Sequence, residues 1–192
     1  MLTEIVCIID RSGSMQAIRQ DAIGGFNQFL EAQKAVPGEA LFTLALFDHE
    51  YLLVQDAVPL ANANPMSNET FVPRGTTALL DAIGRTVNSI GARLHASQSK
   101  PDKVIVLILT DGAENASTEF SSAKIKEMIE HQQQKYAWEF VFLGANQDAI
   151  TAGAAIGIPA HNTVQFAADA QGTADAYRSM SVMSTAYRTG AS

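Results

Sequence analysis

The sequence has almost no cysteine: Cys7 is the single one among 192 residues, so an intramolecular disulfide is excluded. Cys7 lies within the apolar run of residues 5–9. A cysteine in such a run is typical of a small buried hydrophobic residue rather than a reactive thiol. Because disulfides accumulate in oxidising compartments, this usage favours a reducing, cytoplasmic setting.

Basic clusters and long apolar stretches are also missing. The chain has 13 Lys and Arg against 20 Asp and Glu, which gives a net charge of -7, and no basic run exceeds two residues. This balance argues against nucleic acid as a partner, because phosphate binding requires clustered Lys and Arg. Apolar runs such as residues 104–109 are far shorter than the roughly 20 residues of a membrane-spanning helix. No basic segment precedes the first apolar run, which argues against a secretory signal peptide.

The composition that remains is that of a globular protein. Apolar residues make up 47% and charged residues 17% of the chain, a balance that excludes a mainly disordered protein. The length predicts one domain spanning residues 1–192. Its last element is a predicted closing helix at about 172–188, rich in Ala, Ser, Met and Tyr.

Short apolar runs alternate with helical periodicity along the chain. The runs predict strands at residues 4–9, 40–47, 51–55, 103–109, 138–143 and 163–166. The second and third runs are separated only by Asp48, His49 and Glu50, which predicts an antiparallel hairpin. The other runs are separated by helices, which is typical of parallel strands buried on both faces. The predicted fold is therefore α/β: a doubly wound, mostly parallel, six-stranded sheet with helices on both faces and one antiparallel edge strand.

Polar residues follow the predicted strands where a ligand is expected. Asp10, Ser12 and Ser14 come directly after the first strand, Asp111 follows the strand at 103–109, and Thr77 begins a helix. In open α/β sheets, ligands bind at the carboxyl ends of the parallel strands. Carboxylates and hydroxyls without nitrogen or sulfur suit a hard cation, so we predict Mg²⁺, with Mn²⁺ or Ca²⁺ as alternatives, and not Zn²⁺.

These residues also resemble a known motif. The D-x-S-x-S pattern at residues 10–14, a threonine and the T-D-G of residues 110–112 resemble the metal-ion-dependent adhesion site (MIDAS) of von Willebrand factor A domains. Residues 73–83 resemble the family's G-x-T-x-L-x-x-A-I segment, which places the metal threonine at Thr77 rather than Thr76. The resemblance covers nearly the whole chain and is nearest to the small stand-alone bacterial and phage members. It implies that Ser12, Ser14 and Thr77 coordinate the cation directly, whereas Asp10 and Asp111 act mainly through water.

The resemblance further implies a function. We expect a protein-binding module, not an enzyme, in which the metal accepts an Asp or Glu carboxylate from a protein partner. The residues expected to form the partner-binding rim are Arg11, Met15, Thr76, Glu114, Asn115 and Asn146. The loops expected to set specificity are 56–75, 112–120 and 144–148.

Other interpretations of the same residues stay open. Asp10 and Ser14 are also typical of a helix cap, as is Asn146, and Asp111 with Gly112 is typical of a turn. A metal-dependent hydrolase or phosphatase is a second function. An aspartate-nucleophile phosphatase, however, needs an acid where Ser12 stands. A third possibility is a structural assembly subunit with a vestigial metal site, in which the closing helix or a sheet edge carries the contacts.

Overall fold

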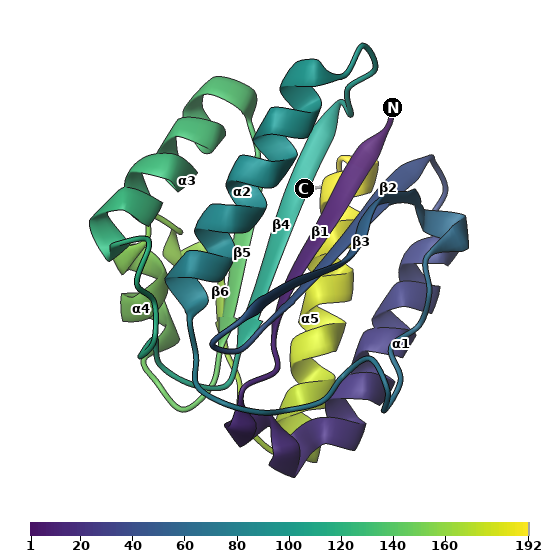
Figure 1. Cartoon of the computed structure of the whole chain (residues 1–192). Coiled ribbons are helices and arrows are strands. Elements are labelled where there is room, and N and C mark those ends of the chain that lie inside the picture. Colours follow the sequence, from purple (N-terminus) through teal and green to yellow (C-terminus); the bar gives the residue numbers. More distant parts are fainter. Residues whose placement is uncertain (192) are drawn as a thin grey trace.

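The computed structural model describes residues 1–191 and contains one six-stranded sheet in the order β3-β2-β1-β4-β5-β6 (Figure 1). The strands are β1 (Thr3–Asp10), β2 (Ala40–Phe47), β3 (Tyr51–Pro59), β4 (Lys103–Thr110), β5 (Glu139–Gly144) and β6 (Thr163–Gln165). All neighbouring pairs are parallel except β2 with β3, which is antiparallel at one edge. The structure thus confirms the predicted α/β fold class.

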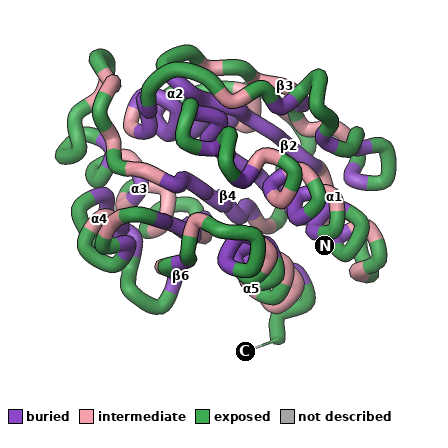
Figure 2. Tube along the Cα trace, turned by 90° about the horizontal axis from the view of Figure 1, so that it is seen from below, coloured by how far each residue is buried: buried purple, intermediate pink, exposed green. Residues whose placement is uncertain are grey.

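Helices cover both faces of the sheet. They are α1 (Arg19–Ala35), α2 (Leu79–Ala96), α3 (Ser122–Tyr136), α4 (Ala149–Ala155) and α5 (Ala170–Thr189), with short 3₁₀ turns η1 (Gly13–Ile18), η2 (Leu60–Asn62) and η3 (Ala160–Asn162). One apolar core packs α1 and α5 against the sheet, and a second core packs α2, α3 and α4 on the opposite face (Figure 1). Figure 2 shows buried residues in the middle of the molecule, along β2 and β4, and exposed residues on the outer surfaces of the helices.

Burial on two faces explains the continuous apolar strands. Every residue of β1 is buried, and so is every residue of β4 except Lys103 at its start. The edge strand β3 is only partly buried, because it has a neighbour on one side. It also runs four residues beyond the predicted end at Gln55, past a bulge where Ala57 has a φ of 49°. No helix within residues 1–191 is long and apolar enough to cross a membrane.

Capping residues account for several helix starts. The Ser121 side chain accepts a hydrogen bond from the Lys124 N–H, so Ser121 caps α3. Asp148 caps α4 through the Thr151 N–H, so the alternative interpretation of Asn146 as the cap is wrong. Asp169 caps α5 through the Gly172 N–H, which places the helix start at Ala170, two residues before the predicted one.

The sheet order places the candidate site. From the central strand β1 the chain first builds β2 and β3 on one side and later β4, β5 and β6 on the other. The carboxyl ends of β1 and β4 are therefore adjacent at the point where the strand order reverses, and Ile9 lies opposite Leu109. Doubly wound sheets form their ligand-binding crevice at this position.

Candidate metal site at the carboxyl edge of the sheet

Asp10 is the last residue of β1, and its carboxylate is fully buried and held at both oxygens. Oδ1 accepts a hydrogen bond from the Ser12 N–H at 2.6 Å, and Oδ2 accepts one from the Thr110 hydroxyl at 2.7 Å. Thr110 is the last residue of the neighbouring strand β4. The carboxylate therefore bridges the two strand ends and has a fixed orientation.

The hydroxyls of the first loop meet the second carboxylate. The Ser14 Oγ donates to Asp111 Oδ1 at 2.7 Å, and the Oγ atoms of Ser12 and Ser14 lie 3.2 Å apart. Ser12 and Asp111 are each only 2% exposed. The structure thus brings together Asp10, Ser12, Ser14 and Asp111 from two loops that are almost 100 residues apart in the sequence.

Thr77 lies on a third loop that is bonded to the first. The Gly13 N–H donates to the Gly75 carbonyl at 3.0 Å, and the Arg74 N–H donates to the Arg11 carbonyl at 2.9 Å. Thr77 itself is 4% exposed, and its N–H donates to Asn115 Oδ1 at 2.9 Å. Backbone hydrogen bonds therefore hold the loop of Thr77, which we call the threonine loop, beside residues 11–14, which we call the serine loop.

The electrostatics of the site favour a bound cation. Burial raises the pKa of Asp10 to about 6, and the neighbouring Asp111 adds to the shift. Burial also raises the pKa of Asp111. Within residues 1–191, no basic side chain forms an ion pair with either carboxylate. Two buried acids without a counter-charge are costly, and a divalent ion offsets that cost.

The donor set fits a hard metal ion. In the described part of the chain, no three His, Cys, Asp or Glu side chains gather as a metal-binding group. The candidate site depends instead on two carboxylates and three hydroxyls, Asp10, Asp111, Ser12, Ser14 and Thr77. Oxygen donors of this kind suit a divalent cation, and hard ions prefer them.

The tip of the β2–β3 hairpin belongs to the same edge, which the sequence analysis did not anticipate. Asp48, the first residue after β2, is fully buried. Its Oδ2 lies 3.2 Å from the Arg11 Nε and 2.9 Å from the Arg74 Nε. Asp48 thereby ties the serine loop to the threonine loop. A usable signal was present, because Asp48, like Asp10 and Asp111, lies at the carboxyl end of a buried strand.

Gly75 supports the contact with the hairpin. It has a φ of +66°, which favours glycine, and a Cβ at this position would lie 2.1 Å from His49 Nδ1. The His49 ring therefore packs directly over the backbone of the threonine loop. A larger residue at position 75 would push the hairpin and the loop apart.

The structure corrects part of the expected partner-binding rim. Met15 is fully buried in the core, because the 3₁₀ turn η1 directs it inward, so its assignment to the rim is wrong. Arg11 is only 8% exposed and is bound to Asp48, so it supports the loop from beneath. Thr76 is exposed beside the buried Thr77.

The remaining rim residues hold the surrounding loops. Glu114 accepts hydrogen bonds from the Leu80 N–H and from both the N–H and the hydroxyl of Ser117. Asn115 fixes the Thr77 backbone, as described above. Asn146 is exposed, with a φ of 57°, and its Nδ2 donates to the Asp111 carbonyl at 2.7 Å. Asn146 is therefore bonded to the backbone of Asp111.

Comparison with known proteins identifies the fold. No protein-family profile and no curated protein sequence matches the chain. Proximal thread matrix protein 1 from the mussel byssus has a TM-score of 0.66 at 14% identity, over 96% of this chain and 46% of that chain. The vWF domain of the type V pili tip protein Mfa5 from Porphyromonas gingivalis has a TM-score of 0.64 at 13% identity, over 94% of both chains. A von Willebrand factor type A structure from Catenulispora acidiphila has a TM-score of 0.62 at 18% identity, over 95% of this chain and 42% of that chain.

These similarities show that the chain has the von Willebrand factor A fold. The chain spans less than half of the mussel and Catenulispora chains. Another structure of the mussel protein has a zinc-occupied MIDAS motif. The similar structures include matrix, pilus-tip and pilus-adhesin proteins.

Proposed function

We propose that this chain is a divalent-cation-dependent protein-binding module. Ser12, Ser14 and Thr77 would hold the cation directly, and Asp10 and Asp111 mainly through water. The observation that carries the proposal is the convergence of carboxylate and hydroxyl oxygens from the β1 and β4 loops at the switch point of the sheet, with no basic side chain of residues 1–191 paired to them. Oxygen donors make Mg²⁺ the favoured ion.

The chain's own residues prepare this site for a ligand. When bound, Mg²⁺ supplies an electrophilic position that accepts a carboxylate oxygen from an Asp or Glu of the partner. The Asp10 and Asp111 carboxylates neutralise the ion, while the hydroxyl ligands add no surplus negative charge that would repel an acidic partner. Exposed Thr76 and Asn146 lie beside the site, where a partner's neighbouring residues would make contact.

The loops need little rearrangement to bind. Backbone hydrogen bonds join Gly13 to Gly75 and Arg11 to Arg74, and Asp48 pairs with both arginines. Preorganised loops lose little conformational entropy on binding, which favours affinity. Rigid positioning on three loops is therefore consistent with a recognition site.

The similar structures support binding rather than catalysis. They include adhesion, pilus and matrix proteins, and one of them holds zinc in its MIDAS motif. Hydrolysis would require a general base near the metal. Asp48, the next carboxylate at this edge, is occupied by two arginines. We therefore propose a non-enzymatic module, and we propose a cytoplasmic location on the basis of the single buried Cys7.

Thermal unfolding in Mg²⁺ against EDTA tests the metal site. At ten times the dissociation constant, Mg²⁺ would stabilise the folded state by about 1.4 kcal/mol, or roughly 3 to 6 °C in Tm. The double variant Ser12→Ala, Ser14→Ala would lose this shift but keep its fold in EDTA. Ser97→Ala, Ser99→Ala is the matched control, since these serines lie in a loop at the other end of the sheet. A shift that the double variant retains would contradict the proposal.

Partner binding and turnover test the rest of the function. A partner captured by the wild type should require Mg²⁺ and should be lost with the serine double variant. Binding that persists in EDTA would favour an assembly subunit with a vestigial metal site. Mg²⁺-dependent hydrolysis of p-nitrophenyl phosphate that disappears in Asp10→Ala would favour the hydrolase instead.

A further inference from the structure

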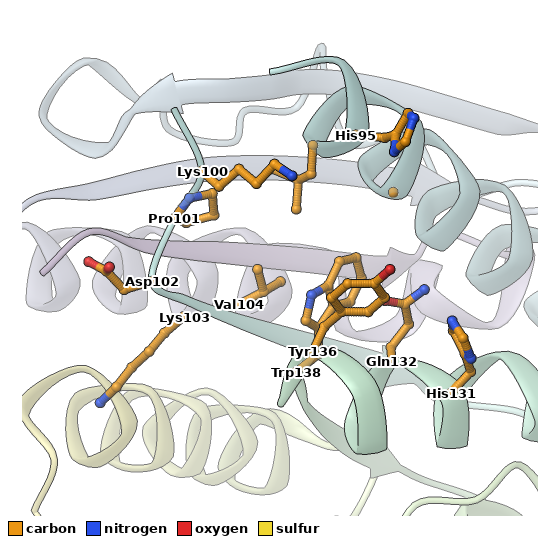
Figure 3. Close-up of a pocket in the computed structure, with 12 residues that line it drawn as sticks. His95, Lys100, Pro101, Asp102, Lys103, Val104, His131, Gln132, Tyr136 and Trp138 are labelled. Carbon is orange, nitrogen blue, oxygen red and sulfur yellow. The ribbon is translucent and has the colours of Figure 1, made fainter. Parts of the chain in front are cut away.

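A second concave region lies at the opposite end of the sheet, where β4 begins. It is a cavity of about 340 Å³ between the C-terminal halves of α2 and α3 (Figure 3). We call it the α2–α3 cleft; it is lined by Gly91 and Leu94 of α2, Gln132 and Tyr136 of α3, Lys100 and Trp138. Lys103, the first residue of β4, also borders it, whereas the candidate metal site lies beyond the last residue of that strand. The cleft is therefore separate from the proposed metal site.

The wall of the cleft is aromatic. Trp138 is 5% exposed and stacks on Phe140, with ring centroids 6.2 Å apart. Tyr136 is 55% exposed, and Figure 3 shows its ring in front of Trp138. On the α2 side, a Cβ built at Gly91 would meet nothing within 4 Å, so the absence of a side chain there keeps the cleft open. The space between these two sides suits a planar apolar group.

The charge of the cleft is basic, although the protein is acidic overall. Within residues 1–191, the lysines that form no ion pair are Lys100, Lys103 and Lys135. Lys100 and Lys103 line the cleft (Figure 3), and Lys135 precedes its Tyr136. Lys103 Nζ donates to the Tyr187 carbonyl on the other face, and Lys135 lies over the Tyr136 ring. Lys100 therefore remains as the free cation of the cleft.

The cleft is also lined by two histidines and one acid, and the acid lies away from the aromatic pair. His95 and His131 add nitrogen atoms on the side of the cleft near Tyr136 (Figure 3). The acid that lines the cleft, Asp102, accepts a hydrogen bond from the Leu2 N–H at 2.6 Å. Figure 3 shows Asp102 at the far side from the aromatic pair. A negative group beside the Lys100 amine would thus lie on the side of the cleft away from Asp102 (Figure 3).

We propose that the α2–α3 cleft binds a small aromatic anion. Its ring would lie between Gly91 and Leu94 on one side and Tyr136 and Trp138 on the other. Its carboxylate or phosphate would pair with Lys100. The inference does not depend on the metal site or on the proposed function of that site.

The position of the sole tryptophan makes the proposal directly measurable. Because Trp138 lines the cleft, its fluorescence would change saturably as phenylacetate is added. Phenylacetamide has nearly the same shape without the charge, and acetate has the charge without the ring. We expect phenylacetamide to bind about tenfold more weakly than phenylacetate and acetate to cause no change, because each lacks one of the two contacts. Phenyl phosphate, tested in parallel, distinguishes a phosphate ligand from a carboxylate ligand.

Two variants connect any binding to the cleft. Lys100→Gln should weaken phenylacetate binding about tenfold and leave phenylacetamide unchanged. Gly91→Leu should abolish binding by filling the cleft, whereas Gly24→Leu, at another open helical glycine on α1, should not. Circular dichroism checks that each variant is folded. The absence of a saturable signal with either anion, or equal affinities for phenylacetate and phenylacetamide, would overturn the proposal.

Discussion

The two ends of the sheet are built in opposite ways. At the carboxyl end, the buried acids Asp10, Asp48 and Asp111 are all hydrogen-bonded, and three loops are joined by backbone bonds. At the amino end, the α2–α3 cleft is open, and Lys100 has no carboxylate partner in the described part of the chain. One end is thus rigid and polar, and the other is open and aromatic.

The topology explains this difference. The loops that follow β1, β2 and β4 leave the sheet side by side, because these three strands are parallel neighbours. The loops at this common edge bond to each other and leave buried carboxylates close together. At the amino end of β4, the ends of α2 and α3 flank the strand and leave a hollow between them. The comparison teaches that the same sheet order creates a preorganised site at one end and an open cleft at the other.

The largest expected effect is the loss of Asp48. Asp48→Ala would leave Arg11, which is only 8% exposed, without its carboxylate. Removing one partner of a buried ion pair costs about 3 to 5 kcal/mol of folding free energy. Chemical denaturation of the wild type and the variant in EDTA measures this cost. Glu127→Ala, which removes an exposed partner of Lys124, is the control and should cost less than about 1 kcal/mol.

The second expected effect is a gain of stability when the Asp10 carboxyl is removed, and its size depends on pH. The Asp10 pKa of about 6 lies above its ordinary value of 3.8, so the folded state retains a proton that the unfolded chain releases between these values. The stability of the metal-free protein should therefore decrease as pH rises from 4 to 6, by up to about 3 kcal/mol. Asp10→Asn should remove this decrease and be more stable than the wild type at pH 8 in EDTA.

Urea unfolding at several pH values measures both proteins. The same protonation should oppose Mg²⁺, so the Mg²⁺-dependent gain in Tm should diminish below about pH 6. A wild-type stability that is flat between pH 4 and pH 6 in EDTA would show that Asp10 is not an uncompensated buried acid. In that case the rigid end would not depend on a cation for its charge balance.

The smallest expected effects come from two glycines seven residues apart on α2. A Cβ at Gly84 would lie 2.7 Å from the Phe120 ring, whereas one at Gly91 would meet nothing within 4 Å. Gly84→Ala should therefore destabilise the fold by about 1 kcal/mol or more. Gly91→Ala should stabilise it by roughly 0.5 to 1 kcal/mol, because alanine is the better helix former. Equal effects of the two substitutions on Tm would contradict the contrast between the rigid carboxyl end and the open amino end of the sheet.

Much of the candidate site was predictable because it depends on local sequence. The apolar runs ending at Ile9 and Leu109 place Asp10 and Asp111 just beyond two buried strands, and parallel strands end at a common edge. Capping by Ser121 follows from its position before a helical pattern. Met15 shows the limit, because the burial of a residue in a loop depends on how the turn rotates it against the core.

The sequence by itself determined the order of strands and helices, the two-sided burial of the sheet and the oxygen-rich edge. These properties follow from apolar periodicity and from residues close together in the chain. Tertiary structure alone decided that Asp48 joins two loops, that Glu114 and Asn115 hold their surroundings, and that Lys100, Gly91 and Trp138 share a cleft. These contacts join residues tens of positions apart, and no local pattern encodes a contact whose geometry depends on the packing of separate elements.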